Sequence, residues 1–196
     1  MKLLITGFDP FGGETANASW DVVKELPESL GNVQITKLQI PTVFEEAAAC
    51  VIRAAQQLQP QPQVILCIGQ AGGRDAVTPE RIGINLRDAS ICDNAGNCPR
   101  EERIDPQGPD GLFATVPVAE MVEAIRSAGL PARVSNTAGT FVCNDVLYTL
   151  LNHYRDTSVR VGFIHVPWGY GQGTPFLAME NTFKALCQAI RVLDKE

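Results

Sequence analysis

The stretch Val64-Ile65-Leu66-Cys67-Ile68 is an uninterrupted apolar run of strand length. A strand in the middle of a parallel sheet is covered by helices on both faces, so it shows such a run instead of an alternating pattern. Residues typical of loops flank the run, with prolines in 59–62 and glycines in 69–73. The run therefore predicts a central strand that is buried on both faces.

Predicted strands and helices alternate on either side of this run. The apolar patterns favour strands at 2–6, 33–40, 81–86, 132–135 and 159–165, and helices at 19–26, 45–58, 118–128, 144–154 and 176–192. This alternation predicts an α/β fold with a single domain over residues 1–196. We expect an open, twisted, mostly parallel sheet with helices on both faces. The segment 88–111 is rich in Asp, Asn, Pro and Gly, and a loop is expected there.

Four polar or glycine-rich loops, at 7–13, 69–74, 137–140 and 167–173, fall at the ends of predicted strands. Ligands of open parallel sheets bind outside the carboxyl ends of the strands. We therefore expect the functional site at this edge of the sheet. The glycine loops lack the G-x-G-x-x-G and P-loop spacings, and G-x-S-x-G does not occur in the chain. A dinucleotide enzyme and a serine hydrolase of that type are accordingly disfavoured.

The composition argues against several classes of partner. Charged residues make up 19% of the 196 residues, the net charge is −6, and no run of Lys and Arg exceeds two. We expect no nucleic-acid partner and no membrane association. No apolar stretch approaches the roughly 18 residues that span a bilayer, and the apolar N-terminal run is too short for a signal-peptide core.

Six cysteines are present, and we expect them to be reduced because the chain is large enough to fold without disulfides. Cys50, Cys67 and Cys187 stand among apolar residues and are expected to be small core side chains. The spacing of Cys92 and Cys98 matches no common zinc pattern, so no metal site is predicted. A thiol redox protein that uses this pair stays open as an alternative.

Cys143 is the candidate nucleophile. It follows Phe141-Val142 and enters a helical pattern that is expected to begin near 144. The positive end of a helix dipole favours the thiolate and lowers a thiol pKa that is about 8.5 in a free cysteine. Gly139 allows a close backbone approach, and amides near Cys143 are candidate oxyanion donors. The alternative is a buried, inert cysteine.

An imidazole can come from two residues, His153 and His165. His165 ends an apolar strand, which is a natural place for a catalytic base, although a structural histidine is the alternative. His153 lies at a polar helix end and is expected at the surface. Glu80 directly precedes a predicted strand, so its carboxylate could turn inward to orient the imidazole. The alternative is a surface carboxylate paired with Arg81.

Six segments form a specific set: Thr6-Gly7-Phe8-Asp9-Pro10-Phe11-Gly12-Gly13, Pro41-Thr42-Val43-Phe44, Gly69-Gln70-Ala71-Gly72-Gly73-Arg74, Glu80-Arg81-Ile82-Gly83-Ile84-Asn85, Ser135-Asn136-Thr137-Ala138-Gly139-Thr140-Phe141-Val142-Cys143-Asn144 and Phe163-Ile164-His165-Val166-Pro167. In this order they resemble the pyroglutamyl peptidase type I family, also called pyrrolidone-carboxylate peptidase. The resemblance spans residues 6–167.

This resemblance implies a cysteine exopeptidase that removes an N-terminal pyroglutamyl residue from peptides without metal or cofactor. It implies an open α/β/α sandwich of the phosphorylase/hydrolase-like type, and a homotetramer in the cytoplasm. By motif match the nucleophile is Cys143, the general base His165 and the orienting acid Glu80. The substrate pocket that it implies consists of Phe8, Phe11, Thr42, Gln70, Ile91, Phe141 and Val142.

The pocket chemistry suits a pyroglutamyl ring, which is a neutral lactam with one N–H and one C=O. Phe8, Phe11 and Phe141 would cover the ring carbons while backbone groups satisfy the lactam. A free N-terminal glutamate or glutamine would bring a desolvated ammonium without a partner. An unpaired buried polar group costs roughly 1–3 kcal/mol, and more when it is charged, so such substrates are rejected.

The chain departs from the family in the segment that commonly reads D-A-R-I-x-D-N. Ser90 stands where the family has an arginine assigned near the oxyanion site, and Arg87 could reach in its place. A second departure is Ala18 in place of the proline in Asn-Pro-Ser-Trp. These changes leave open a catalytically weakened relative that binds pyroglutamyl or similar lactam ligands. Restoring the arginine by Ser90→Arg is predicted to raise kcat/KM.

Overall fold

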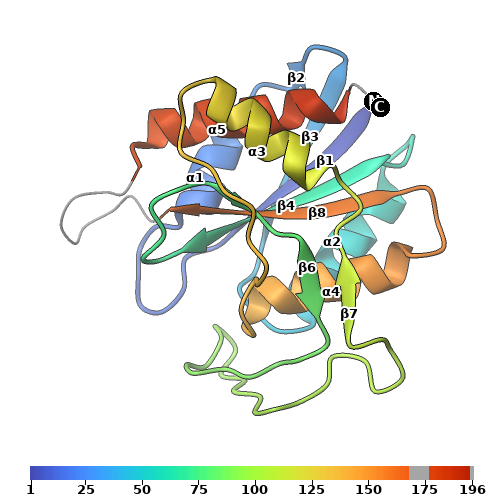
Figure 1. Ribbon diagram of the computed structural model, residues 1–196. Coiled ribbons are helices and arrows are strands. Elements are labelled where there is room, and N and C mark those ends of the chain that lie inside the picture. Colours follow the sequence, from blue (N-terminus) through green and yellow to red (C-terminus); the bar gives the residue numbers. More distant parts are fainter. Residues whose placement is uncertain (168–176, 195–196) are drawn as a thin grey trace.

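The computed structural model describes residues 1–167 and 177–194 (Figure 1). Its main sheet has six strands in the order β2-β3-β1-β4-β8-β5. The strands are β1 (Lys2–Phe8), β2 (Ser29–Leu30), β3 (Val33–Ile40), β4 (Val64–Ala71), β5 (Thr78–Pro79) and β8 (Arg160–Pro167). The four longer strands are mutually parallel, whereas β2 and β5 are antiparallel edge strands. The predicted fold class is confirmed.

Strand β4 lies in the middle of this sheet, between β1 and β8. Its residues from Val64 to Ile68 are all buried, as the uninterrupted apolar run predicts. Leu66 and Ile68 belong to the hydrophobic core on one face, whereas Ile65 and Cys67 belong to the core on the other face. The strand is therefore covered on both sides, and its carboxyl end lies between the carboxyl ends of β1 and β8.

Helices cover the two faces unequally (Figure 1). Helices α1 (Ala18–Glu25), α3 (Val118–Ser127) and α5 (Met179–Leu193) supply apolar side chains to one core. Helices α2 (Glu46–Gln57) and α4 (Val142–Tyr154) supply them to the other. Helix α4 is the element that brings the candidate nucleophile to the sheet.

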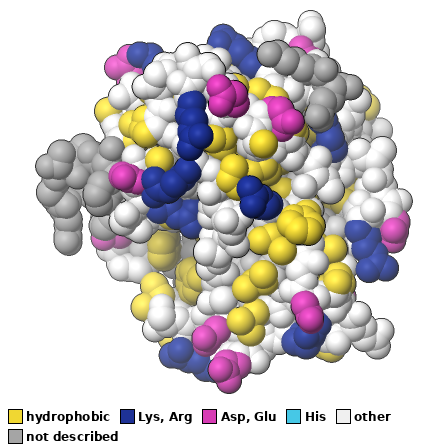
Figure 2. All heavy atoms as spheres, viewed as in Figure 1, with side chains coloured by type: hydrophobic (Ala, Val, Ile, Leu, Met, Phe, Trp, Pro, Cys, Tyr) yellow, Lys and Arg dark blue, Asp and Glu magenta, His cyan; other side chains and the backbone are white. Residues whose placement is uncertain are grey.

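A second, two-stranded sheet of β6 (Ile82–Ile84) and β7 (Gly111–Phe113) stands beside α4, outside the main sheet (Figure 1). Hydrophobic side chains gather on the face where these strands lie (Figure 2), and Phe113 is 67% exposed. The long segment between the two strands is a loop throughout, which agrees with the prediction for 88–111.

Several boundaries differ from those predicted. The short strands β2, β5 and β7 were not predicted, because two or three residues are too few to show a pattern. The expected strand at 132–135 is reduced to isolated bridges, Val77 with Ala132 and Glu80 with Ser135. Helix α1 begins at Ala18, one residue before the predicted start, and is capped by Asn17, whose side chain accepts from the Ser19 amide. Residues 168–173 of a predicted loop lie outside the described residues.

The expectation that all cysteines are reduced is wrong for one pair, because Cys92 and Cys98 form a disulfide. Asp93 explains how they meet. Its carboxylate accepts hydrogen bonds from the amides of Ala95 and Asn97, which folds the intervening residues into a tight turn. The spacing in the sequence does not reveal this turn. The other four cysteines are free.

Candidate active site

A small cavity of about 170 Å³ lies at the carboxyl ends of the parallel strands. Strand β1 contributes Phe8, β4 contributes Gln70 and β8 contributes His165. Cys143 faces the same cavity from the first turn of α4. The remaining lining residues come from the adjoining loops and α1's cap; they are Phe11, Asn17, Thr42, Ala138 and Phe141. The cavity is thus at the edge of the sheet that the loop positions predict.

Cys143 is the second residue of α4, which begins two residues earlier than the pattern predicts. Phe141 caps the helix in an extended conformation, and its carbonyl accepts from the Asp145 amide. Before it, Gly139 takes a positive φ of 80° that favours glycine. The Thr140 hydroxyl fixes the loop by donating to the Asp88 carbonyl at 2.8 Å. The thiol is therefore held at a helix N-terminus by the loop before it.

Gly69 of β4 leaves the space that Cys143 occupies. A Cβ atom at this position would lie 3.0 Å from the Cys143 sulfur and 2.7 Å from the ring of Phe163. Both distances are too short for ordinary contacts, so a side chain at 69 would displace the thiol or the ring. Gly69 thus allows the candidate nucleophile to pack closely against β4.

Glu80 and His165 form a buried pair. His165 Nδ1 lies 2.7 Å from Glu80 Oε1, and the two residues are 4% and 0% exposed. Glu80 is directed inward because its amide donates to the Phe163 carbonyl of β8 at 2.8 Å, next to the short edge strand β5. The alternative of a surface carboxylate paired with Arg81 is therefore wrong. A carboxylate can only accept, so Nδ1 donates and Nε2 is left as the basic nitrogen.

Arg74 also contacts Glu80, and the sequence reasoning did not single it out. Its Nη1 donates to Glu80 Oε1 at 2.7 Å, and its Nη2 donates to the Thr137 carbonyl at 3.1 Å. The residue stands in the Gly-Gly-Arg turn after β4, but nothing in that pattern indicates that its guanidinium turns inward. Asn17 is another lining residue that the sequence reasoning missed.

Burial sets the protonation of the two reactive groups. It raises the pKa of the Cys143 thiol to about 12, and the Glu80 carboxylate raises this pKa further. Burial also lowers the pKa of His165, against the opposing effect of Glu80. The free protein therefore holds a neutral thiol beside a neutral imidazole. The expectation of a thiolate favoured by the helix dipole is wrong here, because desolvation outweighs the dipole.

Aromatic rings form the apolar wall of the cavity. The rings of Phe11 and Phe141 have centroids 6.1 Å apart, and Phe44 packs edge-on against Phe141 at 5.2 Å. Phe8 packs at 6.3 Å against Phe163, deeper in the core. Phe44 supports this wall from behind without lining the cavity itself.

Two polar side chains of the cavity are fixed by the backbone around them. Gln70 Oε1 accepts from the Ala18 amide at 2.7 Å, so its amide nitrogen is the group left for a ligand. Thr42 donates from its hydroxyl to the Asp9 carbonyl at 3.2 Å, and its amide donates to the Asp9 carboxylate at 2.7 Å. These contacts fix the positions of both side chains without a ligand.

The loop closed by the disulfide braces this same wall. Asn94 donates from Nδ2 to Pro10 O at 2.9 Å and to Asp9 Oδ1 at 3.2 Å, while its amide donates to the Thr42 carbonyl at 3.1 Å. The 92–98 segment is therefore fastened to Asp9 and Pro10, which lie between Phe8 and Phe11 in the chain, and to Thr42.

Two residues predicted for the pocket do not line the cavity. Ile91 is 50% exposed, and the Val142 side chain is completely buried in the core beneath α4. The expected substitute for the missing arginine is also unavailable. Arg87 donates to Asp145 at 2.6 Å and to Glu45 at 2.7 Å, and it belongs to a different hollow with Phe44 and Glu102. Ser90 itself is exposed.

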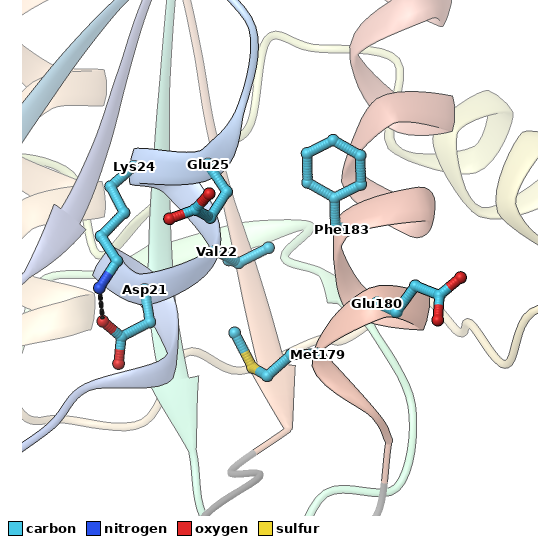
Figure 3. A pocket seen from close by; sticks show the side chains of 7 residues that line it. All are labelled: Asp21, Val22, Lys24, Glu25, Met179, Glu180 and Phe183. Carbon is cyan, nitrogen blue, oxygen red and sulfur yellow. Dashed lines mark hydrogen bonds and ion pairs between the residues drawn. The ribbon is translucent and has the colours of Figure 1, made fainter.

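A larger hollow of about 540 Å³ lies between α1 and α5, on the face of the sheet opposite α4 (Figure 3). Met179 and Phe183 of α5 lie across from Val22 of α1, and Asp21, Glu25 and Glu180 carry carboxylates there. Lys24 pairs with Asp21. This hollow contains neither a thiol nor an imidazole, so its size does not make it the reactive site.

His153 lies away from both hollows. It is exposed, as the sequence predicts, and its ring packs against the ring of Tyr154.

Within residues 1–167 and 177–194, no helix combines the length and apolar character that a bilayer crossing requires. The same part of the chain brings no three His, Cys, Asp or Glu side chains together as metal ligands.

Comparison with known proteins gives the family. A sequence model described as pyroglutamyl peptidase matches residues 1–196. The chain is 47% identical to pyrrolidone-carboxylate peptidase of Levilactobacillus brevis, covering 98% of this chain and 97% of that protein. It is 44% identical to pyrrolidone-carboxylate peptidase 1 of Caldanaerobacter subterraneus subsp. tengcongensis, covering 100% and 98%.

Solved structures agree. Pyroglutamyl peptidase I from Bacillus amyloliquefaciens superposes with a TM-score of 0.94 at 42% identity, covering 100% of this chain and 95% of the other. A mutant pyrrolidone carboxyl peptidase from P. furiosus gives 0.92 at 34%, covering 100% and 99%. Fold and site together define a cysteine hydrolase. More narrowly, the chain belongs to the pyroglutamyl peptidase family.

Proposed function

We propose that this protein is an omega exopeptidase that hydrolyses the amide bond after an N-terminal pyroglutamyl residue of peptides. Cys143 is the nucleophile, His165 the general base and Glu80 the acid that orients His165. One observation carries the proposal: the buried Glu80–His165 pair, joined at 2.7 Å, opens onto the same small cavity as the Cys143 thiol. The names of the relatives point to the same substrate class.

The first half of the reaction forms a thioester. Because thiol and imidazole are both neutral at rest, His165 Nε2 takes the proton from Cys143 Sγ as the sulfur attacks the pyroglutamyl carbonyl carbon. Glu80 stabilises the imidazolium that results. Amides in the first turn of α4 have no partner inside the helix, and the Cys143 amide is the candidate donor to the oxyanion. His165 then protonates the leaving amine, and the C–N bond breaks.

The second half returns the enzyme to its starting state. A water molecule gives one proton to His165 while its oxygen attacks the thioester carbonyl carbon. The C–S bond breaks, pyroglutamate leaves, and the sulfur recovers its proton from His165. No group other than water is consumed. Glu80 accepts from Nδ1 throughout, so the same nitrogen of the imidazole acts in both halves.

Selectivity follows from the lining of the cavity. Phe8, Phe11 and Phe141 offer apolar surface to the ring carbons of the lactam. Gln70 and backbone groups offer polar contacts to its N–H and C=O. Among the described lining residues none carries a carboxylate that could pair with an ammonium, so an unblocked N-terminus is disfavoured.

The second candidate is a weakened relative that binds the lactam without efficient turnover. The exposed Ser90 in place of the family arginine, together with the paired state of Arg87, favours it. Release of pyroglutamate from a chromogenic pyroglutamyl amide, with and without iodoacetamide, separates the two. We expect release that iodoacetamide abolishes. Binding of the amide without release would favour the weakened relative, and release that survives alkylation would remove the cysteine mechanism.

We further propose one catalytic domain over 1–196, assembled as a homotetramer in the cytoplasm. The apolar face around β6 and β7, with Phe113 exposed, supports self-association (Figure 2). The family resemblance supports the cytoplasm, whereas the exposed disulfide weighs against it. Light scattering on the purified chain and cell fractionation test these two points; a monomer or an exported protein would contradict them.

A further inference from the structure

One guanidinium joins the three chain segments that carry the proposed catalytic groups. Arg74 Nη1 donates to Glu80 Oε1 at 2.7 Å and also to the Thr78 hydroxyl. That hydroxyl lies 3.3 Å from the carbonyl oxygen of His165. Arg74 Nη2 donates at 3.1 Å to the carbonyl of Thr137, in the loop that leads into α4. The side chain of Arg74 is 22% exposed, so most of it is buried against these segments.

Glu80 depends on this contact because it has few other partners. The residue is completely buried, and Oε2 is a buried atom that finds no hydrogen-bond partner among residues 1–167 and 177–194. Oε1 therefore holds both His165 and Arg74. The contact of Oε1 with Nδ1 is what keeps the proton of His165 on Nδ1 and leaves Nε2 basic.

We infer that Arg74 is a positioning residue of the reaction, acting through Glu80 and through the Thr137 loop to set the acid and the thiol around His165. This inference rests on the proposed function. Arg74 touches no reacting atom, and its role is to fix Oε1 of Glu80 against Nδ1 of His165.

The charge of Arg74 gives the inference a signature in the pH profile. Within the described residues, the charged or titratable groups near His165 are Glu80 from the segment after β5, Arg74 from the turn after β4, and Cys143 from α4, with Cys67 of β4 near Cys143. Arg74 now lowers the pKa of His165, and Glu80 raises it. Removing the cation leaves Glu80 unopposed, so the pKa of His165 rises. Neutral His165 is the active form, and the acid limb of kcat/KM then moves to higher pH.

The experiment compares Arg74→Gln and Arg74→Lys with Arg81→Gln as the matched control, since Arg81 is exposed on a neighbouring segment. For Arg74→Gln we expect kcat to fall about 10- to 100-fold with KM within about threefold, and the acid limb to move up. Arg74→Lys keeps the charge, so its acid limb stays near that of the wild type while kcat falls less. Arg81→Gln should match the wild type.

A double-mutant cycle with Glu80→Gln tests whether Arg74 acts through Glu80. Once Glu80 is neutral, Arg74→Gln should reduce kcat much less than it does alone. Equal losses in both backgrounds, or an unmoved acid limb, would overturn the inference and leave Arg74 a structural residue. If Arg74→Gln fails to fold, Arg74→Lys provides the test: loss of activity as complete as for Cys143→Ser would contradict a role carried by charge.

A measurement without turnover separates failure of this inference from failure of the proposed function. The His165 imidazole is titrated by NMR in the wild type and in Arg74→Gln, with His153→Gln to assign the second histidine. A raised His165 pKa in a chain that does not release pyroglutamate would sustain the electrostatic role and discard the peptidase. An unchanged His165 pKa in an active enzyme would do the opposite.

Discussion

Two of the hollows in the described part of the molecule differ in size and in chemistry, and the larger one lacks the reactive groups. The hollow between α1 and α5 measures about 540 Å³ and offers Met179 and Phe183 with carboxylates around them. The cavity at the strand ends measures about 170 Å³, yet it contains Cys143 and His165. Volume alone would select the first. Reactive groups with a buried, oriented partner select the second, and the smaller volume suits a five-membered lactam.

The sharpest test of this comparison removes the sulfur from the smaller cavity. Cys143→Ser is expected to lose nearly all hydrolysis of a pyroglutamyl amide while the fold is retained, because a serine hydroxyl is far less acidic than a thiol. Turnover and circular dichroism measure the two effects. Cys50→Ser, at a half-buried cysteine of α2, is the control and should keep turnover. Wild-type activity in Cys143→Ser would place the nucleophile elsewhere.

Next in size are changes to the buried pair. His165→Gln removes the base and should bring turnover close to that of Cys143→Ser. Glu80→Gln keeps a hydrogen-bond acceptor for Nδ1 but removes the charge that stabilises the imidazolium, so we expect a smaller loss, on the order of 10²-fold. Steady-state kinetics provides the measurement. A loss in Glu80→Gln larger than in His165→Gln would show that Glu80 has a role beyond orienting the base.

The protonation states predict a pH profile of defined sign. His165 has a pKa below the usual 6.5 and must be neutral to accept a proton, so kcat/KM should be level above pH 6.5 and fall only at lower pH. The Cys143 thiol has a pKa of about 12. Alkylation of the free enzyme by iodoacetamide should therefore still be accelerating above pH 9, by about tenfold per pH unit. A plateau at neutral pH would mean a resting thiolate.

A smaller effect is expected outside the cavity wall. Ser90→Arg is predicted to raise kcat/KM by a few-fold, since it restores a cation on the loop where the family carries one, and because Arg87 is already paired. Kinetics on the same amide measures it, with Ser90→Gln as the uncharged control of similar length. An unchanged or lower value for Ser90→Arg would discard the idea that this departure weakens the enzyme.

The least effect on turnover is expected in the larger hollow. Phe183→Ala should leave kcat/KM within about twofold. It should lower the free energy of unfolding by about 1–2 kcal/mol, less than for a fully buried phenylalanine, because Phe183 is only partly buried. Urea denaturation and kinetics measure the two quantities. A large loss of turnover with an unchanged KM would connect this hollow to the reaction after all.

The sequence predicts the long elements well, and for a physical reason. The apolar run from Val64 to Ile68 results from burial on both faces of the sheet, and such burial is visible in the order of apolar and polar residues. Edge strands such as Thr78–Pro79 show no such pattern, because their pairing with β8 depends on the neighbouring segments. Yet it is this edge pairing that turns Glu80 inward.

The site was predictable in its residue types but not in all its contacts. Cys143, His165 and Glu80 stand at strand and helix ends where the motif places them. The inward turn of Arg74 and the pairing of Arg87 with Asp145 depend on distant segments that meet only in the fold. The prediction that the helix dipole lowers the pKa of the Cys143 thiol fails for a similar reason. The dipole belongs to α4 alone, whereas the desolvation that raises this pKa comes from all the segments packed around the thiol.

The disulfide has a practical consequence for anyone who handles this protein. A thiol reagent added to keep Cys143 competent also reaches the exposed sulfurs of Cys92 and Cys98. Opening that bridge frees the segment that Asn94 fastens to Asp9 and Pro10. The same additive thus keeps the Cys143 thiol reduced and loosens the 92–98 segment, which braces the wall of the cavity. Preparations made with and without reductant are therefore two chemically different enzymes.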